Sequence, residues 1–299
     1  MNKVQIVEVG PRDGLQNEKE IVPVASKIKL IDKLVAAGLK RVEASSFVNP
    51  KWIPQLADAE EVLRGIARPK DVTFSALVPN LRGLERAAAC GITEVALFMS
   101  ASESHNQKNI NKSIEETFPV LQEVAREAQA LGLRVRGYVS TVFGCPYEGR
   151  VPLDNSRRVT NELLEMGVFE VSLGDTIGVA TPKQVHEIIG ALVKDVTTER
   201  LAGHFHDTRG TGLANVVAAL SEGLRTFDSS IGGLGGCPYA PGAAGNIATE
   251  DLVYMLHGMN YETGVDLERL TEAGAFIQQE LGRELTSKVL KASLSCKSV

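Results

Sequence analysis

Eight short runs of β-branched residues alternate with amphipathic helical stretches between Val4 and Met255, and this alternation constrains the fold more than any other feature. It predicts a parallel sheet, because each strand must be returned to the same edge by a crossover helix. The predicted strands are residues 4–9, 41–44, 72–77, 94–98, 134–139, 169–173, 201–206 and 226–230. Eight units of about 32 residues each indicate an α/β fold, a (β/α)8 TIM barrel with additional C-terminal helices.

Helices are predicted after each strand, and their ends carry the expected residues. The ranges are 27–37, 56–64, 81–89, 113–131, 154–166, 182–193, 212–223 and 248–257. Ser113 and Glu116 form a capping-box pattern, and Thr181 followed by Pro182 predicts an N-cap and a first helical residue. The glycines predicted to end helices are Gly38, Gly91, Gly132, Gly167 and Gly223.

No linker divides the sequence, so we expect residues 1–299 to form a single catalytic domain. The barrel would occupy about residues 4–258, and residues 259–299 would form a C-terminal helical extension and tail. Within this extension, residues 266–281 are predicted to be helical and residues 283–299 to be a polar tail.

Charge and cysteine content exclude several classes of partner. With 32 basic and 37 acidic residues and no basic run, the overall field repels nucleic acid and anionic membranes. No stretch is long and apolar enough to span a bilayer, and no secretory signal pattern precedes the first strand. The four cysteines have no C-x-x-C spacing, which argues against a disulfide framework and favours a cytoplasmic location.

Functional residues of a TIM barrel lie where strands end and the following loops begin. Candidates at this rim follow or end the first, second, seventh and eighth predicted strands. In chain order they are Arg12, Asp13, Glu43, His204, His206, Cys237 and Asn246. We expect them to lie close together in the folded chain.

The H-x-H pair is the most informative of these features. Residues i and i+2 of a strand point to the same side, so His204 and His206 can share one metal ion while Phe205 faces away. With the carboxylate of Asp13 and the amide oxygen of Asn246 they form a mixed N/O set that suits Mg²⁺, Mn²⁺ or Co²⁺. For the two histidines alone, a buried hydrogen-bonded role without metal remains the alternative.

Arg12 and the glycine-rich loop supply the other candidate groups. The Arg12 guanidinium would pair with Glu43 or with an anionic intermediate, and a plain salt bridge at the rim is the alternative. Cys237 lies in a loop with four glycines, where a thiol can donate or accept a proton. The same G-C-P-Y sequence surrounds Cys145, so local sequence leaves the choice between the two cysteines open, although Cys237 lies nearer to Asn246. No G-x-G-x-x-G follows the first strand and no P-loop occurs, which disfavours nucleotide chemistry.

Several segments resemble the hydroxymethylglutaryl-CoA lyases over nearly the whole chain. They are residues 7–18 (VEVGPRDGLQNE), 46–52 (SFVNPKW), 136–140 (RGYVS), 172–178 (SLGDTIG), 204–208 (HFHDT) and 232–246. The Arg-Asp pair and the H-x-H pair resemble a wider superfamily that includes isopropylmalate and homocitrate synthases. The G-L-G-G-C-P-Y loop resembles that of the lyases and is the specific signal.

The resemblance implies retro-Claisen cleavage of (S)-3-hydroxy-3-methylglutaryl-CoA to acetyl-CoA and acetoacetate, as in leucine degradation and ketone-body formation. It implies Mg²⁺ or Mn²⁺ as the cofactor, an acyl-CoA as the small-molecule substrate, and a homodimer. The metal ligands it implies are Asp13, His204, His206 and Asn246, with Glu43 supporting the site. The other roles it implies are enolate stabilisation by Arg12, proton donation by Cys237, an acidic group at Asp175, and an acid/base role for His204.

Two other functions fit part of the pattern. A Claisen-condensing synthase, which joins acetyl-CoA to a 2-oxo acid, would need the same metal site. The glycine–cysteine loop and the short C-terminal region argue for cleavage instead. A catalytically silent metal-binding barrel is the second alternative, and the presence of Arg12, Asp13 and Cys237 argues against it.

Overall fold

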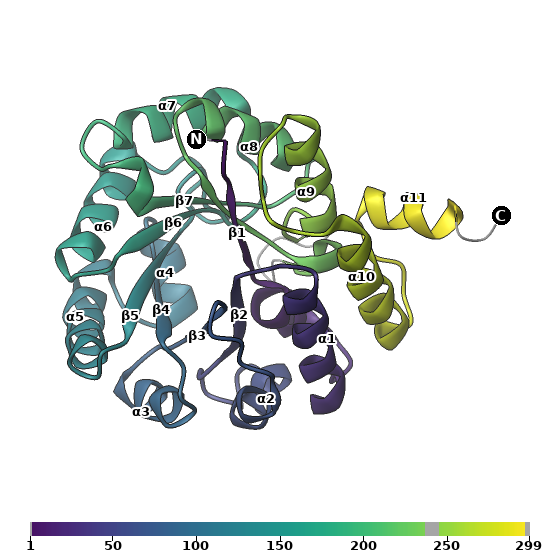
Figure 1. Ribbon diagram of the computed structural model, residues 1–299. Helices are drawn as coiled ribbons and strands as arrows, with labels where there is room; N and C mark the ends of the chain where they lie inside the picture. The colour runs from purple at the N-terminus through teal and green to yellow at the C-terminus, as the bar shows by residue number, and fades with distance from the viewer. Residues whose placement is uncertain (1, 237–244, 297–299) are drawn as a thin grey trace.

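The computed structural model describes residues 2–236 and 245–296, and in it eight parallel strands close into a barrel (Figure 1). The strands follow one another around the barrel in chain order. They are β1 (Gln5–Glu8), β2 (Arg41–Ser46), β3 (Thr73–Leu77), β4 (Glu94–Ser100), β5 (Arg134–Ser140), β6 (Glu170–Asp175), β7 (Leu201–Phe205) and β8 (Thr226–Ser229). Each strand begins and ends within two residues of its predicted position, so the predicted TIM barrel is confirmed.

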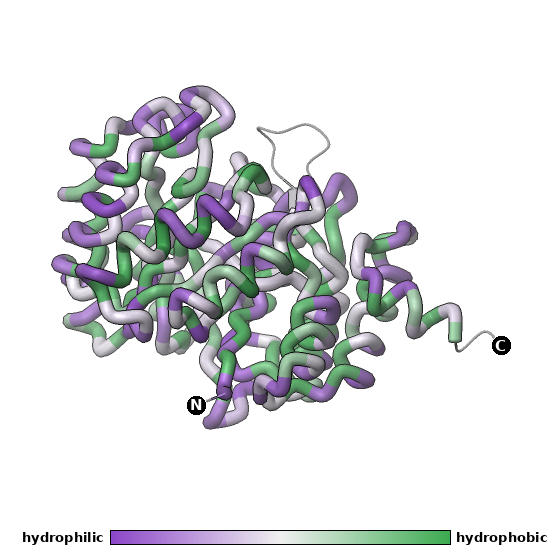
Figure 2. Tube along the Cα trace, turned by 90° about the horizontal axis from the view of Figure 1, so that it is seen from above, coloured by the Kyte–Doolittle hydropathy of each residue, from purple (hydrophilic) through white to green (hydrophobic). Residues whose placement is uncertain are grey.

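Helices surround the barrel on its outside (Figure 1). They are α1 (Val24–Ala36), α2 (Ala59–Gly65), α3 (Leu81–Ala89), α4 (Glu103–Ile110), α5 (Ile114–Ala130), α6 (Leu153–Glu165), α7 (Pro182–Leu192), α8 (Gly212–Ser221), α9 (Thr249–Gly258), α10 (Leu267–Leu281) and α11 (Lys288–Cys296). Hydrophilic and hydrophobic residues alternate along them in Figure 2, as expected for helices with one buried face. None of the described helices is long and apolar enough to cross a bilayer.

The residues predicted to cap or end helices are confirmed. Ser113 caps α5 by accepting a hydrogen bond from the Glu116 N–H at 3.0 Å, and Thr181 with Pro182 begins α7. The five glycines predicted to end helices all have positive φ, between 70° and 103°. Only glycine adopts this conformation without a steric cost, so these positions fix where the helices stop.

The helix prediction is wrong in three places. The range 56–64 divides into a 3₁₀ turn, Pro54–Leu56, and the later α2. The polar helix α4 was not predicted at all. The predicted polar tail contains α11, which extends away from the barrel in Figure 1 and buries Leu290 where it contacts α9 and α10.

Charged side chains fill the middle of the barrel. Arg41 on β2 pairs with Glu170 on β6 at 3.0 Å, and Arg136 on β5 pairs with Asp228 on β8 at 2.7 Å. Neither pair of strands is adjacent, so these contacts cross the barrel interior. All four side chains are almost completely buried. Buried charges require partners of this kind. Through Asp228 these ion pairs connect to His204 at the rim, where the candidate residues lie.

Candidate metal centre

The sequence suggested that Asp13 lies at the end of a strand. In the structure a tight turn after β1 places it instead. Residues Gly10–Gly14 form a single π-helical turn, in which the N–H groups of Arg12, Asp13 and Gly14 all donate to the Val9 carbonyl. Such turns are rare and occur often at functional sites. A side chain at Gly14 has no room, because a Cβ there would lie 2.8 Å from the Ser230 hydroxyl.

The turn brings Asp13 to the two histidines at the end of β7. Ligand atoms of Asp13, His204 and His206 all lie within 4.8 Å of one another. The Nε2 atoms of the two histidines are 3.3 Å apart, and His204 Nε2 is 3.9 Å from Asp13 Oδ2. Phe205 is fully buried on the other side of the strand, with its ring 5.7 Å from that of Phe143. The i, i+2 prediction is therefore confirmed.

Asn246 joins this cluster through the backbone of His206, with which it forms an isolated antiparallel β-bridge. Its side-chain N–H₂ donates to Asp13 Oδ2 at 2.8 Å and to the Leu234 carbonyl at 3.2 Å. Its Oδ1 is buried and has no hydrogen-bond partner among the described residues. A buried carbonyl oxygen without a partner is costly unless something else binds it, and a cation would do so.

The residues present fit a divalent cation. Two imidazole nitrogens and one carboxylate converge, and the Asn246 amide, whose oxygen has no partner among the described residues, contacts that carboxylate. This mixed N/O set suits Mg²⁺ or Mn²⁺. Burial, and then the neighbouring His204, lower the pKa of His206 to about 4. Its ring is therefore neutral near pH 7, as a metal ligand must be.

Arg12 lies beside the cluster as a buried cation. Its Nε donates to Glu43 Oε2 at 2.7 Å, and its Nη1 donates to Asp13 Oδ1 at 2.5 Å. Burial opposes its charge, but Glu43 and Asp13 raise the pKa of Arg12 well above its ordinary value. Burial likewise opposes the charge of Asp13, but Arg12 and the histidines lower its pKa. Arg12 is thus a fixed positive charge, as predicted, and its pairing with Glu43 is confirmed.

Comparison with known proteins decides the family. The HMGL-like family model matches residues 3–277. The chain belongs to this family. Among its relatives, the mitochondrial hydroxymethylglutaryl-CoA lyase of Bos taurus is 55% identical over 97% of this chain and 90% of that protein.

Two bacterial members of the HMGL-like family add information on ligands. A Pseudomonas aeruginosa protein named 3-hydroxy-3-isohexenylglutaryl-CoA/hydroxymethylglutaryl-CoA lyase is 52% identical over 98% of both chains. The structure of a hydroxymethylglutaryl-CoA lyase from Acinetobacter baumannii, in complex with coenzyme A and 3-methylmalate, has a TM-score of 0.94 and 42% identity. That comparison covers 97% of this chain and 95% of the other.

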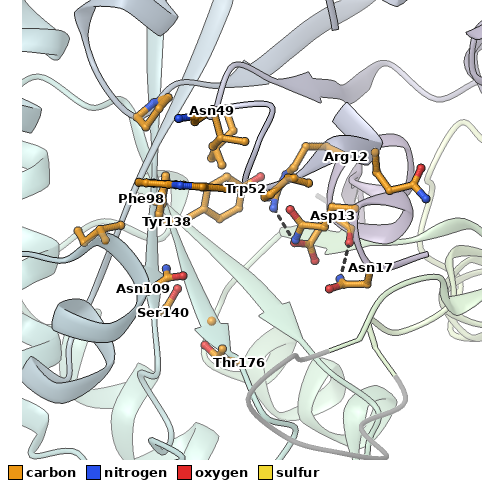
Figure 3. A pocket seen from close by; sticks show the side chains of 18 of the residues that line it. Arg12, Asp13, Asn17, Asn49, Trp52, Phe98, Asn109, Tyr138, Ser140 and Thr176 are labelled. Carbon is orange, nitrogen blue, oxygen red and sulfur yellow. Dashed lines mark hydrogen bonds and ion pairs between the residues drawn. The ribbon is translucent and has the colours of Figure 1, made fainter. Parts of the chain in front are cut away.

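A cavity of about 1020 Å³ is lined at one end by the candidate metal ligands Asp13, His204 and His206 of this HMGL-like barrel. Arg12, Asp13 and Asn17 line one side of it (Figure 3). Apolar side chains line the opposite side, where Phe98 packs near Tyr138 (Figure 3). Val48, Leu77 and Phe98 pack together with Tyr138 at this side and line the cavity. One side of the cavity is therefore charged and the other is apolar, and a single ligand can contact both.

Asp175 and Cys145 do not line the cavity, and Cys237 lies outside the described residues. Asp175 is buried at the same rim, but it accepts hydrogen bonds from the backbone N–H groups of Val179 and Ala180 and is not among the residues lining the cavity. Burial raises its pKa to about 6. Cys145 is buried against the Ser102 hydroxyl and does not line the cavity either. Cys237 lies outside the described residues, and Gly236 just before it lines the cavity.

Sequence reasoning missed two residues that contact the site of this HMGL-like chain. Asp228 on β8 lies 3.1 Å from His204 Nδ1, and Tyr138 on β5 donates its hydroxyl to Glu43 at 3.1 Å. A signal for Asp228 existed in the sequence. A carboxylate in the middle of a short strand that is buried throughout must face a polar partner, and in a barrel that partner lies inside.

Proposed function

We propose that this chain is a divalent-metal-dependent lyase that cleaves (S)-3-hydroxy-3-methylglutaryl-CoA to acetyl-CoA and acetoacetate. The observation that carries the proposal is the convergence of Asp13, His204 and His206, with Asn246 in contact with Asp13 and Arg12 beside it, in a member of the HMGL-like family. The relatives' names supply the substrate. The coenzyme A in the Acinetobacter baumannii structure supports a thioester ligand.

The reaction breaks the C2–C3 bond of the acyl group. The hydroxyl on C3 loses its proton, C3 becomes the ketone of acetoacetate, and the bonding electron pair passes to the thioester as an enolate. A proton added to C2 then gives acetyl-CoA. When bound, a divalent cation at the four-residue site would lower the pKa of the substrate hydroxyl.

The residues of the chain divide the remaining tasks. Asp13, His204, His206 and Asn246 would hold the cation. Arg12 has five N–H donors, and its contacts with Glu43 and Asp13 hold the guanidinium in place while leaving donors for a substrate oxygen. A preorganised cation of this kind stabilises negative charge that develops only as the bond breaks. Proton transfer by Cys237, Asp175 or His204 stays a prediction.

The test is direct. Purified protein is stripped of metal with EDTA, dialysed, and assayed for acetoacetate and acetyl-CoA from hydroxymethylglutaryl-CoA with and without added Mg²⁺ or Mn²⁺. We expect turnover to disappear on chelation and to return with either ion. Full turnover in EDTA would refute the metal-dependent mechanism. Condensation of acetyl-CoA with a 2-oxo acid, in place of cleavage, would favour the synthase.

A second candidate substrate has a larger group than methyl on C3. The apolar wall formed by Val48, Leu77 and Phe98 faces the same cavity as the metal ligands. The Pseudomonas aeruginosa relative is named for a substrate with an isohexenyl group at this carbon. A long apolar substituent would bury its surface against this wall at about 0.8 kcal/mol per methylene. The ratio of kcat/KM for the two thioesters tests this substrate range.

Three further predictions stay predictions. They are the homodimer, the cytoplasmic location and the single catalytic domain spanning residues 1–299. Analytical ultracentrifugation and limited proteolysis of the purified chain test the first and the third.

A further inference from the structure

A chain of buried hydrogen bonds runs from the centre of the barrel to the proposed metal ligand His204. Arg136 donates from Nη2 to Asp228 Oδ1 at 2.7 Å, and from Nη1 to Asp228 Oδ2 at 3.3 Å. Ser172 donates its hydroxyl to Asp228 Oδ2 at 2.6 Å. The same Oδ2 lies 3.1 Å from His204 Nδ1. All four side chains are buried, so water does not replace any of these partners easily.

This arrangement fixes which nitrogen of His204 carries the proton. A carboxylate paired with a guanidinium is ionised and can only accept hydrogen bonds. The nitrogen that faces it, Nδ1, must therefore carry a hydrogen, so that in the neutral ring the lone pair is on Nε2. Nε2 is the atom that faces His206 Nε2 at 3.3 Å and Asp13 Oδ2 at 3.9 Å. The lone pair thus lies where a metal ion would need it.

We infer that Asp228 is a positioning residue, which holds His204 in the metal-binding tautomer and is itself held by Arg136. The inference rests on the proposed metal site and deepens it. Asp228 does not join the set of ligating atoms, because Arg136, Ser172 and His204 already occupy its oxygens.

The same guanidinium also supports the other half of the site. Arg136 Nη1 donates to the Tyr138 hydroxyl at 2.7 Å, and that hydroxyl donates to Glu43 Oε2 at 3.1 Å. Glu43 Oε2 in turn accepts from Arg12 Nε at 2.7 Å. Arg136 therefore supports both His204, the proposed metal ligand, through Asp228 and Arg12, the guanidinium proposed to bind the enolate oxygen, through Tyr138 and Glu43.

A general role in stability is the competing explanation, and the barrel offers a matched control for it. Glu94 is as deeply buried as Asp228 and pairs with Arg41, which also contacts Glu170. Among the described residues, the ion-pair partners of Glu94 are Arg41 and Arg134, neither of which is a proposed ligand. Asp228→Asn and Glu94→Gln therefore remove the same kind of buried charge, one beside His204 and one away from it.

The experiment measures two properties in the absence of substrate. Nitrogen-15 NMR of the metal-free protein reports the His204 tautomer, which is tractable with five histidines in the chain. Titration with Mn²⁺ reports metal affinity. In Asp228→Asn the amide oxygen would turn to Arg136 and its N–H₂ to His204, so the proton moves to Nε2. We expect this tautomer change and a loss of Mn²⁺ affinity of roughly 10- to 100-fold, with Glu94→Gln unchanged.

Several outcomes would overturn the inference. They are an unchanged tautomer and Mn²⁺ affinity in Asp228→Asn, or an equal loss of affinity in Glu94→Gln. If Asp228→Asn does not fold, Ser172→Ala removes one hydrogen bond to Asp228 and keeps the charge, and it should weaken Mn²⁺ binding by a few-fold; no change would count against the inference. Wild-type protein that has the tautomer and binds Mn²⁺ but does not cleave hydroxymethylglutaryl-CoA would overturn the proposed function alone.

Discussion

The two sides of the barrel mouth differ in kind. On the side of β1, β7 and β8, Asp13, His204 and Asn246 lie close together, and Arg12 contacts Asp13. On the side of β3, β4 and β5, Leu77 and Phe98 present hydrocarbon to the same cavity. The polar side is built for bond breaking and the apolar side for recognition, so substitutions on the two sides should affect different measured quantities.

The largest effect is expected from His206→Ala on the polar side. Loss of one imidazole ligand would remove the cation, and with it several kcal/mol of transition-state stabilisation. Since each 1.4 kcal/mol is tenfold in rate, kcat should fall by roughly 10³-fold or more. Mn²⁺ titration and acetoacetate release provide the two measurements. His186→Ala, at an exposed histidine on α7, is the control and should keep both properties. Comparable activity in the two variants would remove the metal centre from the mechanism.

Arg12→Lys should separate charge stabilisation from metal binding on the same side. Lysine keeps the positive charge but cannot contact both Glu43 and Asp13 through a planar fork of donors. We expect kcat to fall by about 10²- to 10³-fold, while Mn²⁺ affinity changes much less. Arg134→Lys, at a half-exposed arginine on β5, serves as the control. A parallel loss of kcat and Mn²⁺ affinity would mean that Arg12 acts through Asp13 and not on the substrate.

The polar side also depends on two buried carboxyl groups behind it. Glu8 accepts hydrogen bonds from the N–H groups of Gly10 and Ile231, and Glu250 accepts one from Gly232. These contacts tie together the turn that carries Asp13 and the segment after β8. Burial raises the pKa of Glu8 to about 7 and that of Glu250 to about 8.

Stability should therefore fall as pH rises. Both folded-state pKa values lie above the ordinary value of 4.5, so these groups favour the folded state below pH 4.5 and lose that contribution as pH rises through 7 and 8. Glu250→Gln, which stays neutral, should reduce the decline in unfolding free energy between pH 5 and pH 9 by on the order of 3 kcal/mol. Urea unfolding at the two pH values measures it. Glu284→Gln, at an exposed glutamate, is the control. If the unfolding free energy of Glu250→Gln declined between pH 5 and pH 9 as much as that of the wild type, Glu250 would not titrate in this range.

The sequence predicted the polar side better than the apolar side for physical reasons. Strand count and the i, i+2 rule placed His204 and His206 together, because both depend only on local periodicity. The π-helical turn at Gly10–Gly14 was missed, since it depends on three N–H groups sharing the Val9 carbonyl. Asp228 was missed because its partner Arg136 is 92 residues away.

The helix α11 was missed for a related reason. It has only nine residues, of which Leu290 is the buried one. Its first turn is capped by Asp251 of α9, which accepts from the N–H groups of Lys288 and Val289 at 3.0 and 2.8 Å. Ser287, directly before the helix, also accepts from the Leu290 N–H at 3.1 Å. The Asp251 contacts come from a different helix and are invisible to local pattern reading, whereas the Ser287 cap is a local signal that the sequence analysis missed.

The smallest effect is expected on the apolar side, from Val48→Trp. Val48 is half-buried and lines the cavity, so an indole there would fill space that a long C3 substituent needs while leaving the metal ligands in place. We expect kcat/KM for an isohexenyl thioester to fall about 10-fold relative to that for the methyl substrate, the size of discrimination that an apolar pocket usually achieves. Mn²⁺ affinity should not change. Val217→Trp, on the exposed face of α8, is the matched control. If Val48→Trp lowered both substrates equally and weakened Mn²⁺ binding, the two sides of the mouth would be one coupled unit, and the division between chemistry and recognition would be wrong.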